Sequence, residues 1–103
     1  MEKHFELEDA YKRREESPET FELPTSEEID ALVVGKIVKL IFRIEADNDC
    51  SVERMWVVIK SINDDRSQFK GVLDSDPVIE GTEVASGMEV VFEPRHIIAI
   101  YKD

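Results

Sequence analysis

Two histidines, one cysteine and a set of carboxylates are the residues of this chain that could do chemistry, and their spacing fits no catalytic or metal-binding pattern. His4 and His96 stand near opposite ends of the chain, and Cys50 has no second cysteine. A structural zinc site needs four Cys or His ligands at short spacings. Cys50 and His96 could form a nucleophile and base, but the acidic neighbours of the cysteine disfavour the thiolate that must attack. The sequence therefore predicts no metal and no cofactor, and it favours a protein that is not an enzyme.

Asp74 and Asp76, which flank Ser75, are the best candidates for a pair of acid and base groups. Paired carboxylates do this work in glycosidases. The simpler interpretation is that Asp76 caps a turn at Pro77 with its side chain while Asp74 ends a strand. We favour the simpler interpretation, and both aspartates remain candidates for binding.

Trp56 is open to two interpretations. Its neighbours Met55 and Val57 are typical of a buried strand, in which a tryptophan more often belongs to the core than to a binding surface. Alternatively, Trp56 points away from Met55 and shares the outer face of the strand with Arg54 and Val58. The second interpretation makes it the centre of an amphipathic binding patch.

A tight corner at Glu93-Pro94-Arg95 separates the last two predicted strands and places Arg95 and His96 at the rim of the predicted sheet. If the sheet closes, this corner lies on the same rim as the Trp56 strand and the Asp76-Pro77 turn. The candidate binding residues are therefore Arg54, Trp56, Asp74, Asp76, Arg95 and His96.

Two helical segments are predicted to precede the sheet. Residues 2–16 are rich in helix formers, and Leu7, Ala10 and Tyr11 fall on one stripe. Thr25 and Glu28 have the spacing of a capping box, which begins a second, short helix that ends at Gly35.

From residue 36 the hydrophobic period changes to two. Apolar residues alternate with polar ones over residues 36–44, and further β-rich runs cover 54–62, 68–74, 88–93 and 96–101. A polar loop is predicted at 47–49, and the polar neighbours of Cys50 place it in an exposed loop as well. The pattern predicts a mainly β (α+β) fold, a five-stranded antiparallel SH3-like barrel or strongly bent sheet preceded by one or two N-terminal helices. An open sheet covered by the first helix is the alternative. Residues 1–35 form an acidic helical extension, and residues 36–103 form the barrel-like domain.

Four segments, in this order along the chain, resemble the motifs of one protein family. They are Gly35-Lys36-Ile37-Val38-Lys39-Leu40-Ile41-Phe42, Glu53-Arg54-Met55-Trp56-Val57, Gly71-Val72-Leu73-Asp74-Ser75-Asp76-Pro77 and Phe92-Glu93-Pro94-Arg95-His96-Ile97. Together they resemble a family of small bacterial proteins catalogued as a domain of unknown function, with G-x-x-V-K-L-x-F, E-R-x-W-V and L-x-N-D-P motifs. The resemblance implies a β-rich fold and a bacterial or phage setting, and it supplies no activity.

The charge of the chain excludes several classes of partner. The 103 residues have a formal net charge of −11, and residues 1–35 alone hold 11 acidic and 4 basic side chains. Such a surface repels nucleic-acid phosphates and anionic membranes. No apolar run is long enough to span a bilayer, and the first residues lack the pattern of a secretory signal. A cytoplasmic location is expected.

Two functions from different classes fit these observations. The favoured one is a non-catalytic protein-binding module whose acidic surface engages a partner protein with a basic surface. The alternative is a small-molecule-binding protein or enzyme with a rim site around Trp56, Arg54, Asp76 and His96. A third interpretation is that the negative charge serves solubility alone. The sequence leaves the partner and the oligomeric state open.

Overall fold

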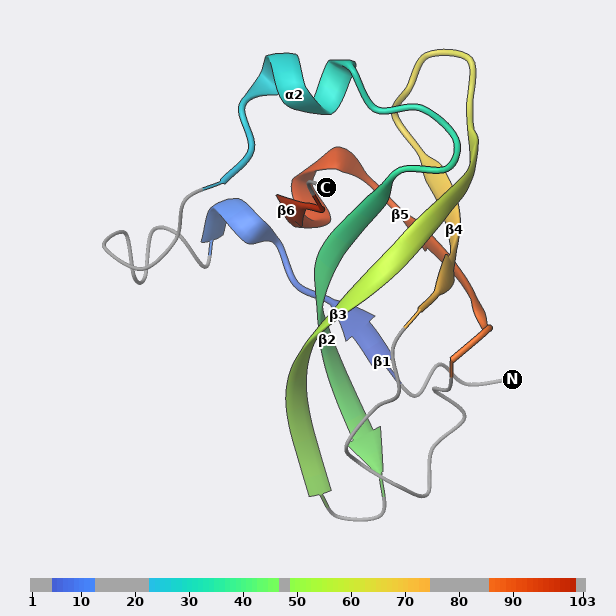
Figure 1. Cartoon of the computed structure of the whole chain (residues 1–103). Helices are drawn as coiled ribbons and strands as arrows, with labels where there is room; N and C mark the ends of the chain where they lie inside the picture. Colours follow the sequence, from blue (N-terminus) through green and yellow to red (C-terminus); the bar gives the residue numbers. More distant parts are fainter. Residues whose placement is uncertain (1–4, 13–22, 47–48, 75–85, 102–103) are drawn as a thin grey trace.

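The computed structural model describes residues 5–12, 23–46, 49–74 and 86–101 (Figure 1), and strands make up most of this part of the chain. The elements in chain order are β1 (Phe5–Leu7), α2 (Ser26–Asp30), β2 (Ile37–Ala46), β3 (Asp49–Ile62), β4 (Phe69–Leu73), β5 (Glu89–Phe92), the 3-10 turn η1 (Pro94–His96) and β6 (Ile97–Ile100). No helix in these described ranges is long and apolar enough to cross a membrane.

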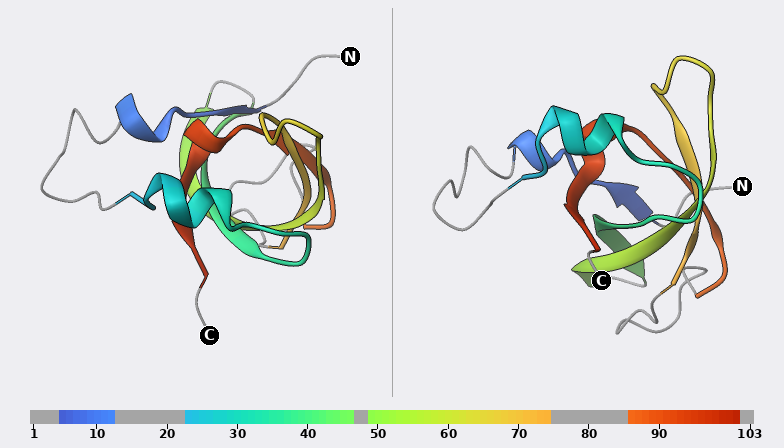
Figure 2. Two further views of the ribbon diagram at one scale, coloured as in Figure 1. Left: turned by 90° about the horizontal axis from the view of Figure 1, so that it is seen from above. Right: turned by 45° about the horizontal axis from the view of Figure 1, so that its top comes forward.

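The sheet is an antiparallel meander whose last strand returns to its start. Strands β2, β3, β4 and β5 pair in sequence order, and β6 pairs with the first half of β2. Seen from above, the strands curve around a central core in a barrel-like arc (Figure 2). The mainly β fold with a strongly bent antiparallel sheet is confirmed, with the five predicted strands as β2 to β6 and β1 as a sixth.

Alternation along the strands sorts the side chains into a buried inner face and an outer face. On β2, Val38, Leu40, Phe42 and Ile44 are fully buried. They join inward-facing residues of the other strands in one core cluster, in which the rings of two more phenylalanines stack with centroids 5.4 Å apart. The other members from the strands are Met55, Val57, Ile59, Phe69, Leu73, Val90, Phe92 and Ile97.

The helix predicted over residues 2–16 is wrong at its N-terminal end. Residues Phe5–Leu7 form a strand that pairs with Phe42–Ile44 at the far end of β2. Strand β6 covers only the near half of this edge of β2, so the far half is left for β1 to pair with. The hydrogen bonds and burial gained there override the helix propensity of the segment.

Helical structure starts only at Ala10, after β1. The Asp9 carboxylate accepts hydrogen bonds from the backbone N–H groups of Tyr11 (2.9 Å) and Lys12 (3.3 Å), as a residue that caps a helix start does. Ala10 is fully buried against Ile41 of β2 and Ile98 of β6, on the outer side of the sheet. The N-terminal segment therefore contributes both a strand and a small second core to the sheet.

The second helix begins as predicted. Thr25 and Glu28 form a reciprocal capping box, with both hydrogen bonds at 3.1 Å. The helix ends at Asp30, and Ile29 and Leu32 pack into the main core. The Ile29 carbonyl of the helix and the Leu32 carbonyl just after it accept hydrogen bonds from the Arg66 guanidinium in the β3–β4 turn, at 3.3 Å and 2.6 Å.

Strand β3 begins five residues earlier than the predicted boundary at residue 54. Its pairing with β2 continues as far as Ala46 opposite Asp49, so Asp49 and Cys50 belong to a strand and the loop predicted there is wrong for both. A long two-stranded ladder extends the hairpin beyond the residues whose alternation is clearest.

Candidate functional site

The candidate binding residues fall on two separate surfaces of the described structure. Arg54, Trp56 and Asp74 lie together, and the Asp74 N–H donates to the Trp56 carbonyl oxygen at 2.9 Å. Arg95 and His96 lie at the other end of β6, in the turn that leads out of β5. Asp76 lies outside the described residues. The single rim expected from the sequence is therefore not assembled from these five side chains.

Trp56 lies on the outer face of β3, half-buried, and does not belong to the core. Strand pairing puts it opposite Lys39, whose Nζ atom is 4.6 Å from the centre of the tryptophan ring. The ring of Tyr101 meets Trp56 edge-on, with centroids 5.6 Å apart and planes at 88°. Both contacts use favoured geometries for aromatic rings.

Tyr101 is a member of this surface that our sequence reasoning missed. It follows β6, and its N–H donates to the Ile37 carbonyl oxygen at 2.8 Å, which places its side chain beside Trp56. Half of the tyrosine is exposed. The only sequence signal was an aromatic residue at the end of the last strand, and its neighbour depends on β6 pairing with β2.

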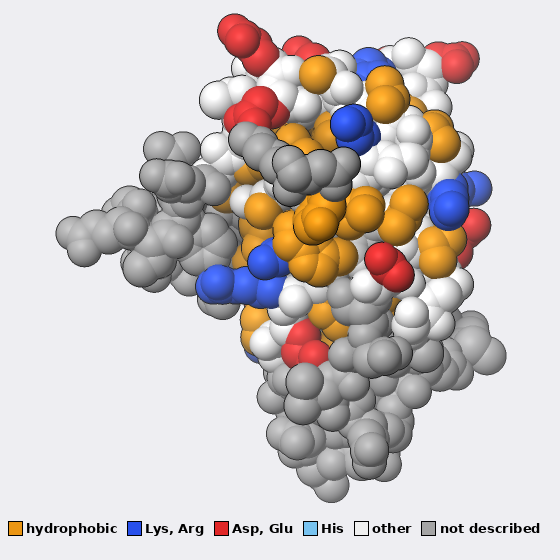
Figure 3. Space-filling view, viewed as in Figure 1, with side chains coloured by type: hydrophobic (Ala, Val, Ile, Leu, Met, Phe, Trp, Pro, Cys, Tyr) orange, Lys and Arg blue, Asp and Glu red, His pale blue; other side chains and the backbone are white. Residues whose placement is uncertain are grey.

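A row of aliphatic side chains lies next to the two aromatic rings. The register aligns Ile37, Val58 and Val72 across β2, β3 and β4, and all three are half-buried on the outer face. We call Ile37, Trp56, Val58, Val72 and Tyr101 the outer patch. Apolar side chains gather in the middle of this face in Figure 3.

Four basic side chains border the outer patch, alongside two acidic ones, Asp74 next to Trp56 and Glu89 opposite Val72. Strand alternation points Lys39, Arg54 and Lys70 to the same face as Trp56, while Lys60 lies at the bulge of β3 and is exposed. We call these four residues the basic rim. In Figure 3, blue side chains stand on several sides of the apolar centre, although acidic side chains are also present. The basic rim is therefore concentrated on one face of a protein whose net charge is −11.

The second surface is built around His96, which is 7% exposed. The backbone N–H of Glu93 donates to His96 Nδ1 at 2.9 Å, and the backbone N–H of His96 donates to the Glu93 carbonyl oxygen at 3.0 Å. Burial, followed by the positive charge of Arg95, lowers the pKa of His96. The imidazole is therefore neutral at pH 7, and because Nδ1 accepts a hydrogen bond, its proton is on Nε2.

Arg95 links the η1 turn to the N-terminal segment through ion pairs. Its guanidinium pairs with Glu93 at 2.9 Å and with Asp9 at 3.4 Å. The hydrogen bond from Arg95 lowers the pKa of Glu93. Burial alone would raise the pKa of Asp9, but hydrogen bonds from the backbone of Lys12 and Tyr11, together with Arg95, lower it. Arg95 therefore serves as a structural ion-pair partner in this arrangement.

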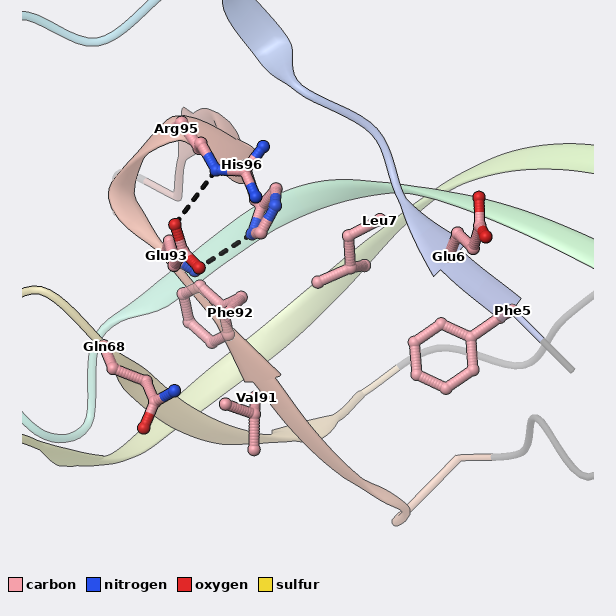
Figure 4. A pocket seen from close by; sticks show the side chains of 9 residues that line it. All are labelled: Phe5, Glu6, Leu7, Gln68, Val91, Phe92, Glu93, Arg95 and His96. Atoms are coloured by element: carbon pink, nitrogen blue, oxygen red, sulfur yellow. Dashed lines mark hydrogen bonds and ion pairs between the residues drawn. The ribbon is translucent and has the colours of Figure 1, made fainter. Parts of the chain in front are cut away.

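A groove of about 450 Å³ lies between this corner and β1 (Figure 4). Strand β1 lines one side and β5 the other, and His96 points from η1 toward β1. The lining residues are Phe5, Glu6, Leu7, Gln68, Val91, Phe92, Glu93, Arg95 and His96.

Neither surface resembles a metal centre, because the described residues contain no group of three His, Cys, Asp or Glu side chains that could hold an ion. Comparisons of the chain with protein-family models, curated proteins and solved structures found no match. The resemblance to a family of small bacterial proteins therefore stays a prediction.

Proposed function

We propose that this protein is a non-catalytic protein-binding module whose contact surface is the outer patch with its basic rim. The observation that carries the proposal is the half-exposed pair of Trp56 and Tyr101 at the centre of an apolar surface. Tryptophan, tyrosine and arginine are the residues that most often dominate binding energy at protein interfaces. An apolar centre with a charged border is the usual anatomy of such an interface.

The charge around the patch favours a partner that presents carboxylates. Lys39, Arg54, Lys60 and Lys70 border the apolar centre, so acidic side chains on the partner would complement them. A nucleic acid also carries negative charge, but the net charge of −11 on this small protein opposes a phosphate polymer that extends beyond the patch.

The basic partner predicted from the sequence would instead contact acidic side chains elsewhere, such as Glu27 and Asp30 on α2. An acidic partner would depend on the positive charges of the basic rim, whereas a basic partner would depend on the negative charges of α2.

A small-molecule site receives less support from the geometry. Such a site was expected to combine Trp56 and Arg54 with Asp76 and His96. Trp56 and His96 lie on different surfaces, and Lys39 and Tyr101 occupy the space beside the tryptophan ring. A hollow of about 510 Å³ adjoins the patch at Ile37 and Tyr101, but Trp56 and Arg54 do not line it.

The test begins with affinity purification from the source cells and is decided on the purified partner. We expect Trp56→Ala and Tyr101→Ala each to weaken the measured affinity at least tenfold, because they remove the centre of the patch. The matched control is Val33→Ala, which truncates an exposed valine that belongs neither to the patch nor to the basic rim. Equal affinities for the wild type, Trp56→Ala and Tyr101→Ala would refute the proposal.

Charge reversal identifies the chemistry of the partner. Lys70→Glu reverses one positive charge of the basic rim, and Glu27→Lys reverses one negative charge on α2. We expect Lys70→Glu to slow association and Glu27→Lys to leave it unchanged or faster, with the association of the wild type weakening as salt is added. The opposite pattern would support the basic partner that the sequence alone suggests.

A further inference from the structure

We infer that the groove between β1 and β5 binds an extended polypeptide segment, which pairs with the sheet as an added strand. This site is independent of the outer patch. Strands β1 and β5 stand at the two ends of the strand order, and neither has a second neighbour among the described residues. Both line the same groove (Figure 4). Unpaired sheet edges are the places where extended peptides add to folded domains.

On β5, the backbone groups of Val91 point away from β4. The Asp74 N–H bonds to β3 and the Leu73 N–H bonds to Met88, so bonds to β3 and β5 alternate along β4. By this alternation Val90, opposite Gly71, bonds to β4, whereas the N–H and C=O of Val91 face the groove. The Val91 side chain is 45% exposed.

On β1, Phe5 and Leu7 have backbone groups that do not bond to β2. The Glu8 N–H donates to the Ile41 oxygen at 3.0 Å, so Glu6 forms the next bonded pair with β2. The backbone groups of Phe5 and Leu7 then face away from β2. Both edges of the groove therefore offer main-chain donors and acceptors to a segment laid between them.

His96 supplies a second, independent sign of an occupant. It is 7% exposed, and its Nδ1 already accepts from the Glu93 N–H. The proton on Nε2 has no acceptor among the described residues. A buried donor without an acceptor is costly, which points to an acceptor provided by a ligand.

The surroundings of His96 favour a neutral acceptor. Glu6 and Glu93 line the groove, and Asp9 pairs with Arg95 at its border. A carboxylate or phosphate ligand would face these three acidic groups against the single positive charge of Arg95, whereas a peptide carbonyl carries no net charge. The partly exposed apolar side chains that line the groove, Phe5, Leu7 and Val91, would contact alternate residues of the added strand.

The experiment uses a displayed library of random 12-residue peptides, selected against the full chain. Affinities of the recovered peptides are then measured by fluorescence anisotropy for the wild type and variants. Val91→Pro removes the N–H that faces the groove but no bond to β4, and Val91→Thr is the matched control because it keeps that N–H. His96→Asn removes the Nε2 donor and keeps an oxygen that can accept from Glu93.

We expect peptides with alternating apolar residues, whose dissociation constants rise about tenfold or more in Val91→Pro and stay within about twofold in Val91→Thr. We expect His96→Asn to raise them about fivefold. If circular dichroism shows that Val91→Pro is unfolded, two other measurements test the site. They are the peptide affinity of His96→Asn and the NMR shift of the wild-type Val91 amide when a peptide binds. Trp56→Ala should leave these affinities unchanged, which separates this site from the outer patch.

Three results would overturn the inference. The first is a selection that recovers no binding peptide. The second is a set of peptides whose affinity for the folded Val91→Pro variant equals that for the wild type. The third is a dimer of the free protein that dissociates in Val91→Pro, since the occupant would then be a second copy of this chain.

Discussion

Arg66 joins two elements that are far apart in the sequence, and its replacement tests how α2 is held to the sheet. The residue lies in the β3–β4 turn with φ at 61°, in the left-handed region that a non-glycine residue rarely adopts. Its guanidinium donates to the Ile29 and Leu32 oxygens at 3.3 and 2.6 Å. Arg66 thus has an unfavourable backbone conformation and a favourable side-chain contact at the same position.

The two effects can be separated with two variants. Arg66→Ala loses both hydrogen bonds and keeps the left-handed backbone. Hydrogen bonds from a charged group contribute about 1.5 to 3 kcal/mol when buried, and because this side chain is partly exposed we expect a loss of about 1 to 2 kcal/mol. Arg66→Gly loses the same bonds but relieves about 1 kcal/mol of backbone strain. The expected order of stability is wild type, then Arg66→Gly, then Arg66→Ala.

Urea unfolding followed by circular dichroism measures these free energies, with a melting shift of about 4 to 8 °C for each kcal/mol in a domain of this size. Hydrogen exchange at the Leu32 amide, which bonds within the end of α2, should quicken in both variants. Asp64→Ala, an exposed change in the same turn, is the control and should shift stability by less than about 0.5 kcal/mol. An Arg66→Ala variant as stable as the wild type would refute the capping role, and one as stable as Arg66→Gly would refute the strain.

Three further outcomes are expected. Gly71→Ala should destabilise the fold by about 2 kcal/mol or more in urea unfolding, because the added Cβ would lie 2.6 Å from the Val58 carbonyl oxygen; an unchanged midpoint would contradict this packing. Because burial lowers the pKa of His96 from 6.5, unfolding favours its protonation, so stability should fall as the pH drops below 6.5, and His96→Asn should remove that part of the dependence. An NMR titration that places the His96 pKa above 6.5 would contradict it. Tyr101→Ala should increase acrylamide quenching of Trp56, since the two rings are in contact, and equal quenching would argue against that contact.

The strands and the second helix were predictable because their signals are local. The alternation from Val38 to Ile44 identifies the inner face of β2 without knowledge of any partner strand. The capping box at Thr25 and Glu28 is likewise contained within four residues. Such signals survive in the fold because the tertiary contacts agree with them.

The first strand and the aromatic neighbour of Trp56 were missed because their causes are not local. Phe5–Leu7 are a strand only because β6 leaves half of one β2 edge without a partner. Tyr101 reaches Trp56 only because β6 pairs with β2 in one register. Nothing in either segment indicates which strand it will adjoin.

The amino-acid sequence by itself determined the net charge, the period of each strand and therefore which side chains share a face. That information placed Arg54, Trp56 and Val58 together on one side of β3, since successive side chains of a strand point in opposite directions. It could not determine what lies beside them, because neighbours across a sheet depend on pairing and register.

The tertiary structure decided where the charges and the open edges lie. Pairing of β2, β3 and β4 placed four basic side chains around Trp56 in an acidic protein, and the bend of the sheet brought β1 and β5 to either side of one groove. Both arrangements join residues that are distant in the chain, so they arise only when the sheet closes on its core.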